Sequence, residues 1–488
     1  MKCFRADVQF ADELRREMRI MRPMPGTAPS VSQVEPIGMN GGQRAPGKRY
    51  PTPFHFVLEG RRDPLGMLTT ARRQYGDVVR FEAWPMILVH LLYHPDHIKH
   101  VLQENNRNYW KGILVGRVKP LIGEGLFTSE GDFWRRQRRL AQPAFHRERI
   151  ESFANLMSAA GTQMLESWQG AAASGTSIDL MEHTSRVTLR IVGQALFGID
   201  LVGESAEVGR AMLDALQFVS DQAFSLFPSQ LVLPTPRNVR FRRARAALDR
   251  VVLGIIEHRR RGGVAGVDLL AMMMEARDED TGEGMSDRQL RDEVMTFVLA
   301  GHETTAVTLA WSCLLLAQHP EIRDQVRQEV TTVLGGRAPA LGDLPRLPLT
   351  RRVVDETLRL YPPVAVIGRQ ALADDEIGGY AIPAGSAVML SPYVTHRHPA
   401  LWPEPERFDP ERFTPERCAT RPRFAYFPFS GGPRLCIGNE FALMEAQILL
   451  AMIVQHYRVD VAPGHTVQTD VRVTLRPRQP MLMRLIGE

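Results

Sequence analysis

Hydrophobic residues crowd the middle of this 488-residue chain, where the stretch VMTFVLAGHETTAVTLAWSCLLLAQ (294–318) is apolar on nearly all sides. The sequence SDRQ (286–289) precedes it and predicts a capping box, with Ser286 at the N-cap and Gln289 at the third helical position. The pair HP ends the pattern at 319–320. Because a helix that is apolar nearly all round is normally buried, we expect this helix to pass through the middle of the protein.

Helical periodicity dominates much of the rest of the chain, and short strands interrupt it. Further helices are predicted at 63–76, 131–142, 148–172, 238–261, 349–361 and 439–457, and strands at 77–81, 86–90 and within 376–390. The predicted fold class is therefore mainly α with small β-sheets. Residues 1–49 are rich in Pro, Gly and Met without a sustained period, so we expect a flexible N-terminal extension and then a single domain over 50–488.

Composition and charge narrow the class of protein. The chain has 60 Lys and Arg residues against 55 Asp and Glu, too small an excess to indicate a nucleic-acid partner. A basic helix at 237–261 could present a nucleic-acid face, but its apolar spacing favours an ordinary amphipathic helix. The chain has only four cysteines, none in CxxC spacing, which argues against a disulfide scaffold and favours free thiols in a reducing environment. We find no signal peptide and no uninterrupted apolar run long enough to cross a bilayer. We therefore expect a cytoplasmic protein without a membrane anchor.

One cysteine stands in the glycine-rich turn FPFSGGPRLCIGNE (427–440). A thiolate that binds a metal needs backbone N–H groups near the sulfur, a nearby positive charge and little competing water. Glycines at 431, 432 and 438 let the backbone come close and adopt positive φ, and Arg434 brings a charge two residues before Cys436. A helix beginning near Ile437 would direct its positive dipole end toward the sulfur. The simpler alternative is a structural cysteine buried in a turn.

This turn resembles the heme-binding signature of the cytochrome P-450 superfamily, F-x-x-G-x-R-x-C-x-G, which is matched by Phe429, Gly432, Arg434, Cys436 and Gly438. The resemblance covers roughly residues 50–488 and implies the cytochrome P-450 fold, a triangular α-rich prism. It also implies heme b as the cofactor, held between the long central helix and the helix after the cysteine. Cys436 would then be the axial ligand of the heme iron.

The long helix carries a second motif of that family, A-G-x-[D/E]-T-[T/S], in AGHETT (300–305). Gly301 weakens the helix, and Thr304 can bond back to a carbonyl one turn earlier and bend it. Standing alone, this segment would indicate a kink. The resemblance implies instead that Ala300 borders the heme, that Thr304 hydrogen-bonds the oxygen being activated, and that Glu303 relays protons.

Two further arginine motifs support the resemblance. ETLR (356–359) and WPEPERFDPERF (402–413) imply a buried triad of Glu356, Arg359 and Arg412 that holds the chain before the cysteine loop, although an E-x-x-R pair alone is usually a surface ion pair. The heme propionates need cations or donors. The family pattern W-x-x-x-R and its usual arginine positions assign these roles to Trp134, Arg138, Arg369 and Arg434.

The motifs together predict a heme-thiolate monooxygenase, acting as a monomer, that inserts one atom of O2 into a hydrophobic small molecule such as a fatty acid, terpenoid, steroid or polyketide. Electrons would come from ferredoxin and an NAD(P)H-dependent ferredoxin reductase. Three arginines are expected to face solvent and to dock this acidic donor: Arg135, Arg136 and Arg139. The substrate pocket is expected at 109–127, at 218–234, near Ala300, and at Val364 and Val366.

Two alternatives keep the heme but change the activity. The first is a peroxide-driven peroxygenase or isomerase, whose members tend to lack the acid–threonine pair that is intact here at Glu303 and Thr304. The second is a heme-thiolate sensor without turnover.

Overall fold

The computed structural model describes residues 43–83, 87–198, 200–202, 211, 214–215, 218, 233–262 and 268–487. The chain divides into two units, Met1–Gln43 and Arg44–Glu488, and the described helices and strands belong to the second. Most of the predicted N-terminal extension, residues 1–42, lies outside the described residues. Strand β1 (Gly47–Arg49) already pairs with the sheet, so regular structure begins just before the predicted domain start at residue 50.

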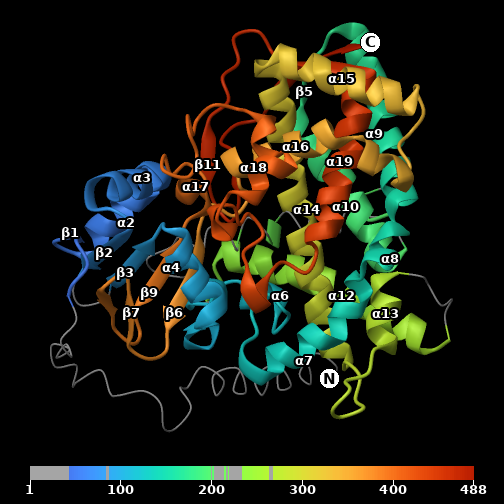
Figure 1. Cartoon of the computed structure of the whole chain (residues 1–488). Helices are drawn as coiled ribbons and strands as arrows, with labels where there is room; N and C mark the ends of the chain where they lie inside the picture. The colour runs from blue at the N-terminus through green and yellow to red at the C-terminus, as the bar shows by residue number, and fades with distance from the viewer. Residues whose placement is uncertain are drawn as a thin grey trace. The chain divides into compact units, whose positions relative to one another are not determined.

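The central helix is α14 (Asp287–Gln318), and most of its side chains are buried. Its predicted capping box is present: Gln289 N–H donates to the Ser286 hydroxyl at 3.3 Å, and Ser286 N–H donates to the Gln289 side chain at 2.8 Å. Helices α10 (Leu180–Phe197), α16 (Pro348–Leu360) and α19 (Asn439–His456) pack around it (Figure 1). The hydrophobic pattern therefore predicted both the position and the burial of this helix.

The remaining predicted helices are present, and several further helices, such as α10, were not predicted individually from the sequence. The helix predicted at 148–172 is divided, because α8 ends at Glu151 and α9 begins at Ala154. The other bounds are α2 Pro53–Arg62, α3 Pro64–Tyr75, α4 Pro95–Lys99, α5 Ile113–Gly116, α6 Lys119–Ile122, α7 Gly131–Ala141, α8 Arg147–Glu151, α9 Ala154–Ser174, α12 Pro236–Arg260, α13 Leu269–Glu275, α15 Pro320–Leu334, α17 Pro392–Thr395 and α18 Pro415–Ala419.

Four small sheets accompany the helices. The largest has the order β1-β2-β3-β9-β6-β4 and lies beside the helical bundle (Figure 1), and the others are β10-β13-β5, β11-β12 and β7-β8. The predicted strands at 77–81 and 86–90 form the antiparallel pair β2–β3. The bounds are β2 Val78–Ala83, β3 Ile87–Leu92, β4 Tyr109–Trp110, β5 Ile178–Asp179, β6 Ile367–Ala371, β7 Asp375–Ile377, β8 Tyr380–Ile382, β9 Ala387–Leu390, β10 Tyr457–Val461, β11 Thr469–Val471, β12 Leu475–Pro477 and β13 Leu482–Gly487.

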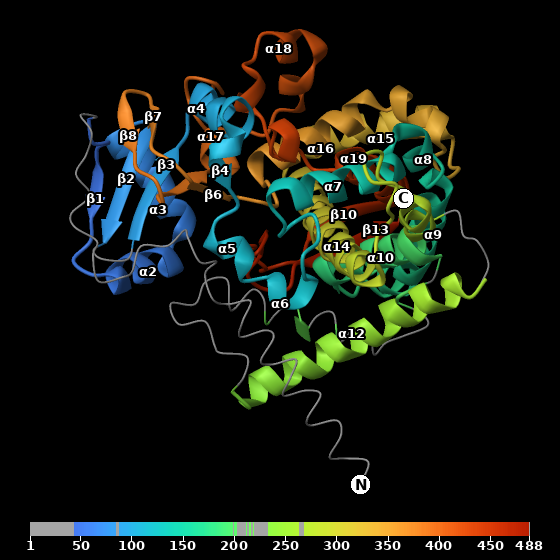
Figure 2. The ribbon, with the colours of Figure 1, turned by 90° about the horizontal axis from the view of Figure 1, so that it is seen from below.

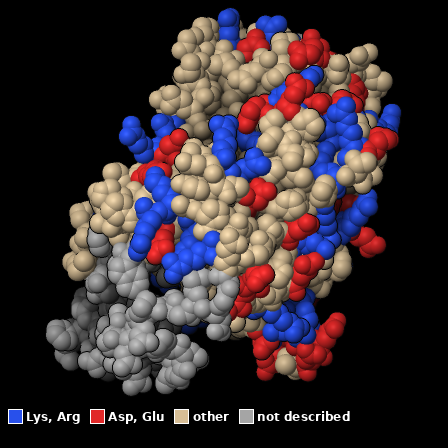
Figure 3. Space-filling model, turned by 60° about the vertical axis from the view of Figure 1, so that its left-hand side comes forward, with Lys and Arg blue, Asp and Glu red and all other residues tan. Residues whose placement is uncertain are grey.

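The basic helix α12 is amphipathic, as its spacing predicted. One stripe that includes Phe241, Leu248 and Ile256 is buried, while Arg240 and Arg243 are exposed. The helix itself lies on the outside of the helical bundle (Figure 2). On the face that Figure 3 shows, Lys and Arg side chains are interspersed with Asp and Glu, in keeping with the small net charge. Among the described helices, none combines the length and the apolar character that a membrane crossing requires.

Candidate active site

The cysteine loop is a tight turn between the short 3-10 helix η7 (Gly432–Arg434) and α19. The backbone N–H of Cys436 donates to the carbonyl oxygen of Phe429 at 3.0 Å, and that of Leu435 donates to Gly432 at 3.1 Å. Gly438 is the N-cap of α19, so the positive end of the helix dipole lies two residues beyond the sulfur. The helix begins at Asn439, as the predicted range 439–457 has it and two residues after the approximate start near Ile437.

The three glycines of the loop differ in backbone conformation and in the space available for a Cβ. Gly432 has φ +63°, and a Cβ on it would lie 1.9 Å from the carbonyl oxygen of Leu102. A Cβ on Gly431 would lie 2.4 Å from the ring of Phe424. Gly438 has φ −95°, and its nearest neighbour would be 3.9 Å away. The expectation that Gly438 has a positive φ or lies very close to other protein atoms is therefore wrong.

Gly432→Ala is expected to destabilise the protein more than Gly438→Ala does. A left-handed conformation costs a residue with a Cβ about 1–2 kcal/mol, and the overlap with a backbone carbonyl adds to that cost. The free energy of unfolding in urea measures both variants, with Gly438→Ala as the matched control. Equal losses for the two variants would contradict this account of the loop.

The Cys436 thiol lies in an unusual setting. Burial raises its pKa, while the backbone amide of Gly438 and the charge of Arg138 favour the thiolate. Arg138 is itself held by a 3.0 Å hydrogen bond from Nη1 to the carbonyl oxygen of Leu435. The Cys436 side chain is nevertheless exposed. Cys436 is therefore accessible to a ligand while lying next to Arg138 and the start of α19.

Arg434 lies at the centre of a cluster of cations beside the loop. It forms an ion pair with Glu130, and its guanidinium stacks 3.7 Å from the centroid of the Trp134 ring. Its Nη1 also donates to the carbonyl oxygen of Ser129 at 3.1 Å. Burial lowers the pKa of Arg434 to about 10, and the carboxylate of Glu130 opposes that effect.

Arg369 and Lys111 complete the cluster. Burial and the charge of Arg434 lower the pKa of Arg369 to about 10, and the same two causes bring the pKa of Lys111 well below its usual value. The ammonium of Lys111 donates to the carbonyl oxygen of Leu126 at 2.6 Å, and its backbone N–H donates to Glu130 at 2.6 Å. Lys111 was not predicted from the sequence, because no motif marks it.

The cations of this cluster have few carboxylate partners within the described residues. Glu130 accepts from Arg434 and from the backbone of Lys111, while burial raises the pKa of Glu293, the other acid near Lys111, to about 8. Arg369 is buried, and its guanidinium donates to the carbonyl oxygen of Gly368 at 2.8 Å. Guanidinium groups placed in this way suit the propionates of a heme, so the residues present fit the group that the sequence motif implies.

The middle of α14 carries the predicted polar motif. The Thr304 hydroxyl donates to the carbonyl oxygen of Ala300 at 2.7 Å, which is the predicted back-bond. Ala300 is exposed in an otherwise largely buried part of the helix. A Cβ on Gly301 would lie 3.0 Å from Val192, so the glycine also lets α10 pack closely against α14. Glu303 points toward the hairpin β11–β12, where Thr474 donates to it.

Comparison with known proteins settles the family. The cytochrome P450 family model matches residues 45–483. The chain belongs to the cytochrome P450 family. It is 37% identical to the cyclooctatin synthase of Streptomyces melanosporofaciens, over 88% of this chain and 93% of that protein. It is 35% identical to cyclooctat-9-en-7-ol 5-monooxygenase from the same organism, over 92% of this chain and 96% of that protein.

Other similarities point the same way. The pentalenene oxygenase of Streptomyces avermitilis is 34% identical over 87% of this chain and 93% of that protein. The crystal structure of the cytochrome P450DA heme domain superposes with a TM-score of 0.83 at 27% identity, covering 91% of this chain and 98% of that one. The P450 family and its fold imply a heme-thiolate cofactor, and the chain is an oxidoreductase of the monooxygenase class.

The E-x-x-R motif of this P450 forms the buried triad that the sequence predicted. Arg359 donates to both carboxylate oxygens of Glu356, at 2.6 and 2.7 Å, and neither side chain is exposed. Arg412 lies 3.5 Å from the same carboxylate. Arg359 also donates to the carbonyl oxygens of His396, Pro405 and Arg407, which ties the segment before the cysteine loop to α16.

The arginines expected to dock an electron donor are already paired within the P450. Arg135 contacts Asp132 at 2.8 Å, and Arg139 contacts Asp278 and Asp280 at 2.8 and 2.6 Å. Arg136 contacts Glu283 at 3.4 Å, and its side chain is only 20% exposed. The expectation that it faces solvent is wrong, because the loop between α13 and α14 covers it.

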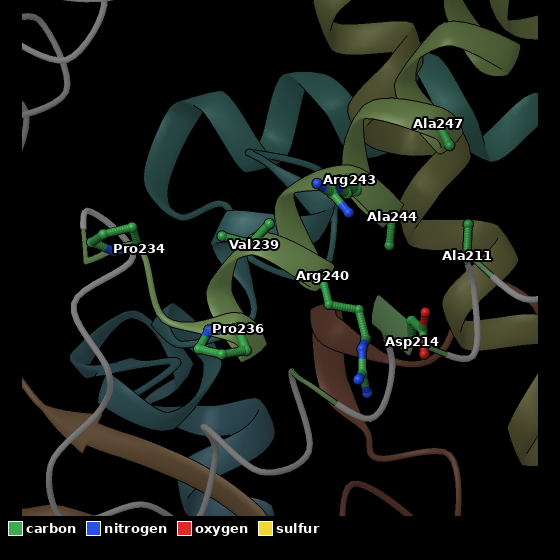
Figure 4. A pocket seen from close by; sticks show the side chains of 9 residues that line it. All are labelled: Ala211, Asp214, Pro234, Pro236, Val239, Arg240, Arg243, Ala244 and Ala247. Carbon is green, nitrogen blue, oxygen red and sulfur yellow. The ribbon is translucent and has the colours of Figure 1, made fainter.

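The predicted pocket segments are partly described. Most of 218–234 lies outside the described residues, so its place in the substrate pocket stays a prediction. Phe127 and Val364, from two other segments, are 45% and 37% exposed. A separate open hollow of about 720 Å³ lies at the start of α12. Figure 4 shows its lining: Ala211, Asp214, Pro234, Pro236, Val239, Arg240, Arg243, Ala244 and Ala247.

Proposed function

We propose that this P450 uses heme b to insert one atom of O2 into a cyclic terpenoid. The observation that carries the proposal is an exposed cysteine before the N-terminus of α19, beside cations that have few carboxylate partners among the described residues. The substrate class is supported by the relatives named for cyclooctatin, cyclooctat-9-en-7-ol and pentalenene. Exposed apolar side chains on the predicted pocket segments, Phe127, Ala300 and Val364, suit a hydrocarbon ring system.

Each group of the site has a defined task in this proposal. When bound, a heme would supply the oxygen chemistry, in which O2, two electrons and two protons yield one hydroxylated or epoxidised product and one water. Cys436 would ligate the iron as a thiolate, a donor that favours O–O cleavage. Lys111, Arg369 and Arg434 would hold the propionates, together with Trp134 and Arg138 on α7. Phe429, Gly432 and Gly438 would shape the loop that carries the sulfur, and Ala300 would line the cofactor site.

Protons reach the oxygen through α14. Thr304 can donate its hydroxyl proton toward the reacting oxygen when it releases the carbonyl of Ala300, and Glu303 supplies protons from solvent. Ferredoxin and ferredoxin reductase serve as electron donors in this proposal, and the protein acts as a monomer in the cytoplasm. Since Arg136 and Arg139 are paired internally, an acidic donor would have to compete with Glu283 and Asp278 for them.

The test is product formation from cyclic terpene hydrocarbons and alcohols under labelled O2. NADPH with ferredoxin and its reductase is compared with hydrogen peroxide alone. We expect a product that contains one labelled oxygen atom only when the electron-transfer proteins are present. Turnover with peroxide alone would favour the peroxygenase alternative, and heme-loaded protein that binds these terpenes without turnover in either mixture would favour the sensor.

A further inference from the structure

Glu303 makes both of its contacts through a single carboxylate oxygen. The Thr474 hydroxyl donates to Oε1 at 2.8 Å, and Nη1 of Arg476 lies 3.6 Å from the same Oε1. Within the part of the chain that the structure describes, no hydrogen bond reaches Oε2. The Glu303 side chain is 13% exposed and that of Arg476 is 38% exposed, so the carboxylate lies between the interior of α14 and solvent.

The segment that holds Glu303 is itself fixed at two points. Strands β11 and β12 pair with each other, and Thr474 lies at the turn between them, almost fully buried. The indole N–H of Trp311 donates to the carbonyl oxygen of Leu475 at 3.0 Å, which ties the hairpin to α14 two turns beyond Glu303. The backbone N–H of Leu475 donates to Pro363 at 2.8 Å.

The same hairpin is anchored beside a predicted pocket position. Val364, a residue predicted to line the pocket, is 37% exposed and adjoins Pro363, which accepts from the hairpin residue Leu475. Val473, next to Thr474, is 36% exposed. A substrate that contacts Val364 would press on the anchor of the hairpin that sets the position of Glu303.

We propose that Thr474 and Arg476 are positioning residues for proton delivery. They hold Oε1 of Glu303 so that Oε2 stays free to accept a proton from solvent and pass it toward Thr304. In each transfer one O–H bond forms at Oε2 and the same bond then breaks, so the charge of the carboxylate is unchanged after each cycle. The ion pair at 3.6 Å to a partly exposed arginine is weak, which suits a group that must move between transfers. This inference rests on the proposed monooxygenase function.

The experiment compares four hairpin variants in the heme-loaded enzyme. Thr474→Val and Arg476→Met remove the contacts, Thr474→Ser and Arg476→Lys restore a donor, and Arg478→Met, an exposed arginine just beyond β12, is the matched control. The readouts are the fraction of consumed O2 that reaches product and the solvent deuterium isotope effect on O2 consumption. We expect the two disruptive variants to lose coupling severalfold and to show a larger isotope effect. The serine and lysine variants and Arg478→Met should match the parent.

A second readout does not depend on turnover. A double-mutant cycle of Glu303→Gln and Arg476→Met, measured by the free energy of unfolding, is expected to be non-additive. If the parent does not turn over, the proposed function fails while the cycle still reports the contact. Unchanged coupling and isotope effect in Thr474→Val and Arg476→Met, in a parent that does turn over, would overturn the positioning role. Additive effects in the cycle would also overturn it.

Discussion

Arg359→Met is expected to lower the free energy of unfolding by about 3–5 kcal/mol, because it leaves the buried carboxylate of Glu356 without its main partner. Burial already raises the pKa of Glu356, and Arg359 is the cation that most opposes this effect. The guanidinium also donates hydrogen bonds to the carbonyl oxygens of His396, Pro405 and Arg407. Arg359→Met removes these three hydrogen bonds as well. Urea unfolding followed by circular dichroism measures the loss.

A matched control lies on the same helix. Arg352 pairs with Glu411 at 3.1 Å, but Glu411 is 53% exposed, so Arg352→Met should cost less than about 1 kcal/mol. The double variant Arg359→Met with Glu356→Leu should recover only part of the loss, because it removes the buried carboxylate but leaves Arg412, the third member of the triad, without that partner. Similar losses for Arg359→Met and Arg352→Met would show that the buried pair does not hold the fold in the way described.

Local sequence signals predicted much of the fold. The capping box at Ser286 and the apolar run after it depend on contacts within a few residues, and so does the back-bond of Thr304. The predicted helices and the β2–β3 hairpin follow from periodicity alone, whereas α10 and α15 were not predicted individually. The interruption between α8 and α9 was missed, because neither Gly nor Pro marks residues 152–153.

The site was harder to predict wherever its contacts are distant in sequence. Lys111 joins Arg369 and Arg434 only in the folded chain, and no motif distinguishes it from a surface lysine. The pairing of Arg136 with Glu283 spans 147 residues, and that of Glu303 with Thr474 spans 171. A motif can indicate that a residue is important, but its partners depend on tertiary packing.

Cys436→Ala is expected to remove the thiolate ligand without unfolding the protein. The loop is held by backbone hydrogen bonds, by Gly432 against Leu102 and by Arg434 against Glu130, and none of these needs the sulfur. Cys418→Ala is the matched control, because Cys418 is an exposed free cysteine on α18. Alanine cannot ligate iron, so any heme retained by Cys436→Ala is held through the propionate cluster and apolar contacts alone.

The absorption spectrum of the dithionite-reduced, CO-bound protein tests the central claim most directly. The parent and Cys418→Ala should show the Soret band at the position typical of a thiolate-ligated heme, and Cys436→Ala should lose that band while remaining folded. The account would be contradicted if the band persisted in Cys436→Ala, or if folded, heme-loaded parent protein never showed it.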